Sequence, residues 1–137
     1  MQSTSLCVLL ALIAWTLFLL ILMEVLRVRY VLTKTVVANE FTPDNSNLPP
    51  FMQRLARAHA NCIESFPIIG GLLVVALLTN RADVTDALAP ALLVARLLQS
   101  SIHLWSTSVL AVNLRFFAFV VQMAIAVYWI WTLLAPM

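Results

Sequence analysis

The sequence predicts an all-α integral membrane protein, a four-helix bundle that forms a single transmembrane domain over residues 1–137. Of the 137 residues, 63% are hydrophobic and only 10% are charged, whereas soluble domains contain about 45–50% apolar and about 25% charged residues. So few polar side chains cannot cover a surface that faces water, which excludes an ordinary soluble enzyme, a nucleic-acid-binding protein and a disordered chain. A helix needs roughly 20 apolar residues to cross the hydrocarbon core, so this length provides for four crossings and one modest loop.

The four membrane spans are expected at about residues 6–26, 51–78, 84–107 and 113–134, with a polar loop over about 27–50. No basic residue precedes the first apolar run, and the run is long enough to span. We therefore expect a retained helix rather than a cleaved signal peptide. The loop is dense in Asn, Asp, Ser and Pro, which is typical of irregular structure.

Individual residues mark the ends of the later spans. Pro49 and Pro50 are suited to begin the second span. Asp83 and Asp86 resemble a capping pair at the start of the third span. The aromatic residues near the end of the fourth span are typical of the belt at a membrane interface: Tyr128, Trp129 and Trp131.

The distribution of Lys and Arg predicts the orientation in the membrane. The first and third loops, with the adjoining helix ends, hold six basic residues, and the opposite side holds only Arg81. The six are Arg27, Arg29, Lys34, Arg54, Arg57 and Arg115. Since cytoplasmic loops carry the excess of Lys and Arg, we expect these two loops in the cytoplasm and both termini on the other side.

Polar residues lie where the membrane makes them costly, because an ionised side chain at membrane depth costs at least ~2.5–3.5 kcal/mol on insertion scales. On the second span, four of them follow helical spacing and fall within an arc of about 80°: Arg54, Arg57, Asn61 and Glu64. On the third span, Arg96, Gln99 and His103 also share one face. Arg115 begins the fourth span, with Gln122 two turns deeper. These side chains converge at one depth near the cytoplasmic surface, which predicts a polar pocket.

Structural roles for some of these residues stay open. Lys34 and Arg54 could extend to anionic lipid headgroups, and Arg57 with Glu64 could form a structural ion pair. Arg96 is expected to need a carboxylate partner, for which Glu64 or Glu24 is available.

Several arginines from different helices suit an anion with more than one carboxylate or phosphate. Glu64 and Asn61 could meet an amino group and an amide of the same ligand. The sequence has no Gly-rich phosphate loop and no Cys/His cluster at metal spacing, so neither a nucleotide nor a metal site is predicted. Cys7 and Cys62 lie in different spans and are expected to remain thiols.

The segment Arg57-Ala-His-Ala-Asn-Cys-Ile-Glu-Ser-Phe-Pro67 resembles the pattern Arg-Ala-x-x-Asn-x-x-Glu-x-x-Pro of the MAPEG family, the membrane-associated proteins in eicosanoid and glutathione metabolism. All five fixed positions match. The chain length, the polar first loop and an arginine at the start of the fourth span are also similar to the family, so the resemblance covers essentially the whole chain.

The resemblance implies a homotrimer embedded in membrane lipids, with glutathione bound as co-substrate between neighbouring subunits on the cytoplasmic side. By position, Arg57, Asn61 and Glu64 would contact glutathione, and Arg27 or Arg29 would reach it from the adjacent subunit. Gln99 and His103 occupy positions where members often have His or Tyr and Tyr. Arg115 matches the arginine that stabilises the glutathione thiolate. The implied activity is that of a glutathione S-transferase or peroxidase acting on a lipophilic electrophile or hydroperoxide.

Departures from the family pattern narrow this expectation. Phe116 and Phe119 stand where prostaglandin-synthase-like members carry Ser and Tyr, and the segment from Arg96 to Arg115 is a few residues longer than in familiar members. A general transferase or peroxidase is therefore favoured over a prostaglandin or leukotriene synthase. Two alternatives remain: a non-catalytic lipid-binding or scaffolding protein of the same fold, and a small transporter with a relay through Arg96, Glu64 and His103.

Overall fold

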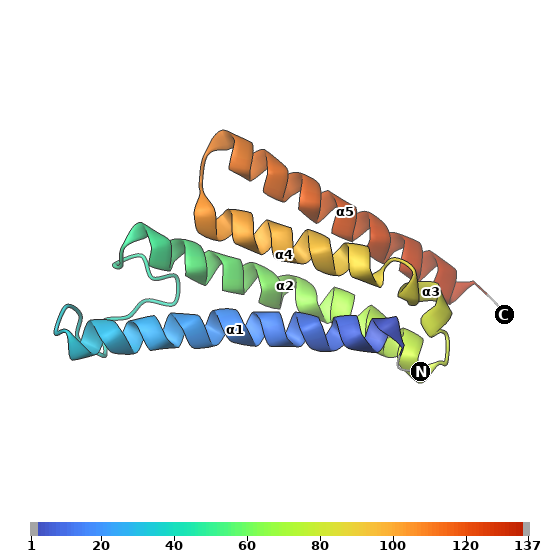
Figure 1. Cartoon of the computed structure of the whole chain (residues 1–137), viewed down its shortest axis with the longest axis horizontal. Coiled ribbons are helices and arrows are strands. Elements are labelled where there is room, and N and C mark those ends of the chain that lie inside the picture. The colour runs from blue at the N-terminus through green and yellow to red at the C-terminus, as the bar shows by residue number, and fades with distance from the viewer. Residues whose placement is uncertain (1–2, 136–137) are drawn as a thin grey trace.

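The computed structural model describes residues 3–135, and in that range the chain forms helices and connecting segments without a β-strand. The helices are α1 (Thr4–Leu32), α2 (Pro50–Leu78), α3 (Ala82–Asp86), α4 (Ala89–Trp105) and α5 (Val109–Leu134). Figure 1 shows the four longer helices lying along one another, with α2 and α4 between α1 and α5. The predicted all-α bundle is confirmed.

Three of the helices are long and apolar enough to cross a membrane: α1, α2 and α5. The fourth long helix, α4, has 17 residues, which corresponds to about 25 Å at 1.5 Å per residue and is slightly shorter than a hydrocarbon core of about 30 Å.

The bundle has two distinct ends (Figure 1). The start of α1, the connection from α2 through α3 to α4, and the last turn of α5 lie together, and we call this the terminal end. The α1–α2 loop (residues 33–49) and the α4–α5 turn (residues 106–108) lie at the opposite end, which we call the loop end. The orientation prediction requires the first and third loops to lie on the same side of the membrane, and the two segments do lie at the same end of the bundle. That this end faces the cytoplasm stays a prediction.

The predicted third span over residues 84–107 is wrong as a single helix. The structure divides it into α3 and α4, separated at Ala87 and Leu88. Pro90 is the physical reason, because a proline ring clashes with the carbonyl four residues earlier and supplies no backbone N–H. That carbonyl belongs to Asp86, the last residue of α3. Within α4, Pro90 lies in the first turn, where no such bond is needed.

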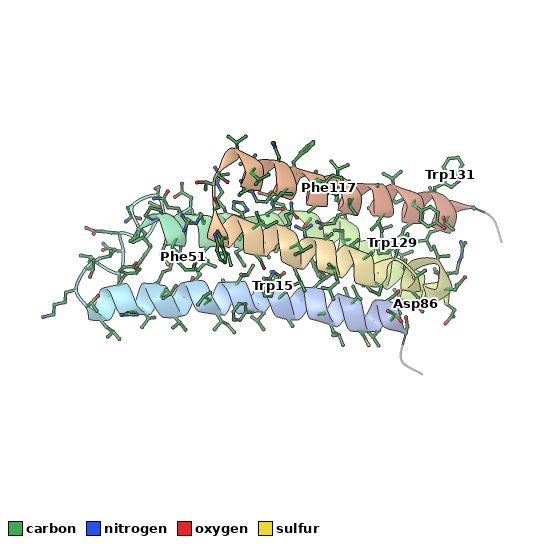
Figure 2. All side chains as sticks on the ribbon, turned by 45° about the horizontal axis from the view of Figure 1, so that its top comes forward. Trp15, Phe51, Asp86, Phe117, Trp129 and Trp131 are labelled. Carbon is green, nitrogen blue, oxygen red and sulfur yellow. The ribbon has the colours of Figure 1, made fainter. Side chains whose placement is uncertain are left out.

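Asp86 also has a different role from the predicted one. Its Oδ1 accepts hydrogen bonds from the backbone N–H of Ser5 at 2.7 Å, the Ser5 hydroxyl at 2.6 Å and the Ser3 hydroxyl at 2.7 Å. The carboxylate therefore caps the start of α1, next to it in Figure 2, and not the helix that follows it. Asp83 lies in the first turn of α3 as expected.

One residue of the predicted aromatic belt cannot reach a membrane interface, and the belt stays a prediction for the other two. Tyr128 and Trp131 are exposed, whereas Trp129 is fully buried and belongs to the apolar core of the terminal end. Figure 2 shows Trp131 projecting outward, while Trp129 points toward the neighbouring helices. Helical periodicity places adjacent residues on different faces, and the face that carries Trp129 packs into the bundle.

The core consists of two apolar clusters with a polar layer between them. At the terminal end, α1, α2, α4 and α5 all contribute buried residues, Trp129 among them. At the loop end, the buried members of the apolar cluster come from α1, the α1–α2 loop and α2, and Leu104 of α4 packs against them. Arg96, Gln99 and Gln122 are buried between the clusters. The space between α2, α4 and α5 at the loop end is therefore not filled by apolar packing.

Candidate functional site

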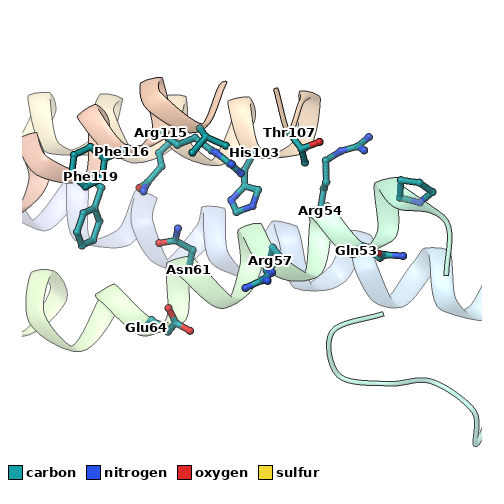
Figure 3. A pocket seen from close by; sticks show the side chains of 13 residues that line it. Gln53, Arg54, Arg57, Asn61, Glu64, His103, Thr107, Arg115, Phe116 and Phe119 are labelled. Carbon is teal, nitrogen blue, oxygen red and sulfur yellow. The ribbon is translucent and has the colours of Figure 1, made fainter. Parts of the chain in front are cut away.

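A pocket of about 740 Å³ lies in this space, between the first half of α2, the end of α4 and the start of α5. Figure 3 shows its lining side chains, with Asn61 pointing from α2 toward the other two helices and with His103 and Arg115 on the facing side. The lining residues are Pro50, Gln53, Arg54, Arg57, Asn61, Glu64, Gln99, His103, Thr107, Val112, Arg115, Phe116 and Phe119.

Six of the eight site residues predicted from the sequence line this one pocket. They are Arg57, Asn61, Glu64, Gln99, His103 and Arg115. Helical spacing explains the agreement, because residues three, four and seven apart share a face. The predicted convergence of polar residues from three helices is therefore present in the structure.

Three of the four charged residues that line the pocket have no hydrogen-bond partner among residues 3–135. Within residues 3–135, the side chains of Arg57, Glu64 and Arg115 form no hydrogen bond, and the ion pair considered between Arg57 and Glu64 is absent. The His103 ring makes no hydrogen bond in this range either, although Arg57 and Arg115 lie close enough to interact with it electrostatically. Their hydrogen-bonding capacity is thus available to a ligand.

Arg54 joins the pocket although the sequence suggested contact with lipid headgroups. Its Nε donates to the carbonyl of Leu104 at 2.9 Å, so the side chain links α2 to the last turn of α4. The signal was present in the sequence, because Arg54 lies three residues before Arg57 on the same helical stripe.

Behind the pocket, the buried Arg96 is bonded to amides rather than to the carboxylate that we expected. Its Nη1 donates to Asn61 Oδ1 at 3.2 Å and to Gln99 Oε1 at 3.0 Å. Glu64 faces the pocket, and Glu24 pairs with Arg27 at 2.9 Å. The relay of the transporter alternative is not connected, since Arg96 has no hydrogen bond to Glu64 or His103 in the described range.

Arg27 and Arg29 lie on α1, outside the pocket of their own chain. Arg27 holds the α1–α2 loop: its Nη2 donates to Asn45 Oδ1 at 2.6 Å, and its guanidinium lies 5.5 Å from the ring centre of Phe41. Arg29 is exposed. The expectation that one of them reaches the pocket of a neighbouring subunit stays a prediction.

An apolar groove of about 660 Å³ continues from the pocket along α5. Phe116 and Phe119 line both spaces, and the groove extends to Trp131 at the other end of the helix. A polar, cationic pocket therefore adjoins an apolar surface, an arrangement suited to a polar ligand and a lipophilic one that meet at Phe116 and Phe119.

The described residues contain no group of three or more His, Cys, Asp or Glu side chains that could hold a metal ion. Cys7 and Cys62 are not joined by a disulfide.

In a comparison with protein families, the model of the MAPEG family matches residues 5–135 of the 137-residue chain. No curated protein and no solved structure matches the chain.

Proposed function

This integral membrane protein belongs to the MAPEG family, and from that premise we propose that it is a glutathione-dependent transferase or peroxidase. In this proposal, the pocket binds glutathione as its thiolate and presents it to a lipophilic electrophile or hydroperoxide from the membrane. The observation that carries the proposal is a set of charges around one pocket that have no partner within residues 3–135: Arg57, Glu64 and Arg115. Charges at membrane depth are costly unless they are paired, and a charged ligand supplies the pairing.

Glutathione has the groups that these side chains lack. Its two carboxylates suit arginine, which can grip a carboxylate with two parallel hydrogen bonds, and its α-amino group suits Glu64. Arg57 and Glu64 are seven residues apart on α2, which is about 10.5 Å along the helix axis. An extended tripeptide with charges of both signs can span that distance.

Arg115 is proposed to stabilise the reactive thiolate. A thiol has a pKa of roughly 8.5, and a nearby guanidinium lowers it, so that more thiolate is present at neutral pH. A fixed positive charge at the sulfur needs no proton transfer of its own. Arg115 lies in the second turn of α5, next to Phe116, which lines both the pocket and the apolar groove. This neighbourhood supports a thiolate within reach of a lipophilic co-substrate.

The two reactions share this thiolate. In transfer, the sulfur forms a bond to an electrophilic carbon, and the leaving group departs with its electron pair. In peroxide reduction, the sulfur attacks the terminal oxygen of a hydroperoxide and breaks the O–O bond, and a second glutathione completes the formation of the disulfide. The products are then an alcohol, water and oxidised glutathione.

Assembly as a homotrimer is part of the same proposal, with Arg29 or Arg27 of a neighbouring subunit completing the pocket. Arg27 is bonded to Glu24, Asn45 and Thr42 of its own chain, whereas Arg29 is exposed. Arg29 is therefore the better candidate. The pocket is proposed to open on the cytoplasmic side, as the distribution of Lys and Arg favours.

A titration with glutathione tests the proposal. A bound ligand raises the thermal midpoint according to its concentration relative to its dissociation constant. We expect stoichiometric protection of the wild-type protein by glutathione, weaker protection of Arg57→Ala, and little protection by a control dipeptide without cysteine. The proposal fails if glutathione protects the wild-type protein no better than the dipeptide does.

A second candidate function, lipid binding or scaffolding without catalysis, is favoured by the apolar surroundings of Arg115. Phe116 is 66% exposed and Phe119 37% exposed, and both line the apolar groove. Fatty-acid binding to the purified protein, with no turnover across a broad panel of electrophiles and hydroperoxides, would support this function instead.

A further inference from the structure

The buried hydrogen bonds behind the pocket determine which atoms of Asn61 and Gln99 face it. A guanidinium nitrogen can only donate, so the atoms that meet Arg96 Nη1 at 3.2 and 3.0 Å must be the amide oxygens, Asn61 Oδ1 and Gln99 Oε1. This assignment does not depend on telling oxygen from nitrogen in the amides themselves.

The hydrogen bonds of Gln122 give the same orientation for the Gln99 amide. A backbone carbonyl can only accept, so the atom of Gln122 that meets the Ala118 carbonyl at 2.9 Å must be its nitrogen, Nε2. The same nitrogen also donates to Gln99 Oε1 at 3.0 Å. Gln99 Oε1 thus accepts one hydrogen bond from Arg96 on α4 and one from Gln122 on α5. If the Gln99 amide were turned, its own Nε2 donor would face these two donors.

The amide nitrogens are left for the pocket. Asn61 Nδ2 and Gln99 Nε2 have no hydrogen-bond partner within residues 3–135, and both residues line the pocket. Arg96 Nη2 and Gln122 Oε1 also lack partners but are buried away from solvent, whereas the two amide nitrogens are not. Each amide therefore presents its N–H groups to the pocket, while its oxygen accepts from the buried Arg96 guanidinium on the other side.

We propose that Arg96 is a positioning residue, which fixes both amides so that Asn61 and Gln99 offer paired N–H donors to an acceptor group of the ligand. A carboxylate or peptide carbonyl is the chemical class that these donors recognise. The proposal rests on the proposed function only for the identity of the ligand, glutathione. The orientation of the amides follows from the network itself.

Asn61→Asp tests the orientation with almost no change of shape. The new carboxylate keeps an oxygen toward Arg96, which gains a charged partner, but it replaces the N–H donor on the pocket side with a second oxygen. We expect a thermal midpoint without ligand at or above that of the wild-type protein. We also expect a glutathione dissociation constant about tenfold higher or more, as the loss of a hydrogen bond to a charged group implies.

Asn113→Asp is the matched control. Asn113 is exposed on α5 and does not line the pocket, so this variant makes the same change of charge without touching the amide pair. Its glutathione affinity should stay within about twofold of the wild-type value, below the size of an effect from one lost hydrogen bond.

Substitution of Arg96 separates positioning from a merely structural role. Arg96→Met removes the donor and leaves the amides free to turn, so glutathione affinity should fall about tenfold. Arg96→Lys again offers only donors and should recover most of that affinity. The positioning role is wrong if Asn61→Asp binds glutathione as tightly as the wild-type protein, or if Arg96→Met and Arg96→Lys bind it equally well.

These experiments also distinguish the two proposals. If the wild-type protein does not bind glutathione, the proposed function fails, and the midpoint of Asn61→Asp relative to Asn113→Asp still decides the orientation. A clearly lower midpoint for Asn61→Asp would overturn the orientation, because the new carboxylate would then gain no stabilisation from Arg96.

Discussion

At the terminal end of the bundle, the charged side chains of Asp86 and Arg81 are bonded to the ends of helices, whereas at the loop end Arg57, Glu64 and Arg115 have no partner in the described chain. Asp86 accepts from the start of α1, where the helix dipole is positive, and Arg81 donates to the last carbonyls of α5, where it is negative. The same residue types therefore serve stability at one end and remain available to a ligand at the other.

This difference predicts that substitutions at the two ends have separate effects. At the terminal end, removing a charge leaves helix-end groups without their partners, so stability should fall while ligand binding is kept. At the loop end, Arg57, Glu64 and Arg115 form no hydrogen bond or ion pair within the described chain, so their removal should reduce binding or turnover and leave stability unchanged. The experiments below test this separation, from the largest expected effect to the smallest.

Arg115→Ala should have the largest effect, on turnover. Removing one group that stabilises a developing or reactive anion costs roughly 10²–10³ in rate. We expect a loss of about this size with a general electrophile, together with loss of the ultraviolet absorbance of the bound thiolate. Arg115→Lys, which keeps a positive charge, should retain part of both signals. An unchanged thiolate absorbance in Arg115→Ala would contradict the assigned role.

Asp86→Ala should have the largest effect on stability. Loss of an N-cap costs typically about 1 kcal/mol and up to about 2, and Asp86 caps α1 from a distant part of the chain. We expect a lower thermal midpoint at pH 7 with an unchanged dissociation constant for glutathione. A large loss of affinity would show that the two ends are not independent.

The pH dependence of this effect follows from its cause. Hydrogen bonds from the Ser5 side chain, then from Ser3 and the Ser5 backbone, lower the pKa of Asp86 below its ordinary value. A carboxylate with a lowered pKa stabilises the fold above its unfolded pKa, about 3.9 for Asp, and loses that contribution as the pH falls through the folded pKa. The difference in midpoint between the wild-type protein and Asp86→Ala should therefore be full at neutral pH and shrink below about pH 4.

The sequence predicted the helices and the pocket better than it predicted the contacts between helices. Apolar content and 3.6-residue periodicity act within one segment, so the stripe of Arg57, Asn61 and Glu64 could be recognised directly. The break before α4 also had a local signal in Pro90. The contact of Arg96 with Asn61 and that of Asp86 with Ser5 had none, because Asn61 lies on another helix and Ser5 is 81 positions away from Asp86.

Arg27 and Arg29, near the end of α1, show the same limit of sequence-based prediction. The sequence offers two arginines, two residues apart, with no reason to prefer either. The difference arises because Asn45 and Phe41 of the folded loop engage Arg27, and the conformation of an irregular loop has no periodic signal in the sequence. Only these tertiary contacts of Arg27 distinguish the two arginines and leave Arg29 as the one available to a neighbouring subunit.

Glu64→Gln should have an intermediate effect, on binding alone. Glu64 is exposed to the pocket and is proposed to bind the α-amino group of glutathione, so its neutral isostere should weaken affinity by several-fold to about tenfold. A glutathione analogue without the α-amino group should bind the wild-type protein and the variant equally. Titrations of both ligands on both proteins measure this. Equal weakening of the two ligands would show that Glu64 contacts a different group.

Arg81→Met should have the smallest effect, again on stability alone. Arg81 Nη1 donates to the Leu133 carbonyl at 2.8 Å and Nη2 to the Thr132 carbonyl at 2.9 Å, and a cation at a helix C-terminus contributes about 0.3–1 kcal/mol. Because that contribution is partly electrostatic, the difference in thermal midpoint between the wild-type protein and Arg81→Met should decrease as salt is added. Methionine preserves much of the apolar stem, so the comparison isolates the guanidinium. If Arg81→Met changed glutathione affinity as much as Glu64→Gln does, charge at the terminal end would be coupled to the pocket, and the separation of the two ends would be wrong.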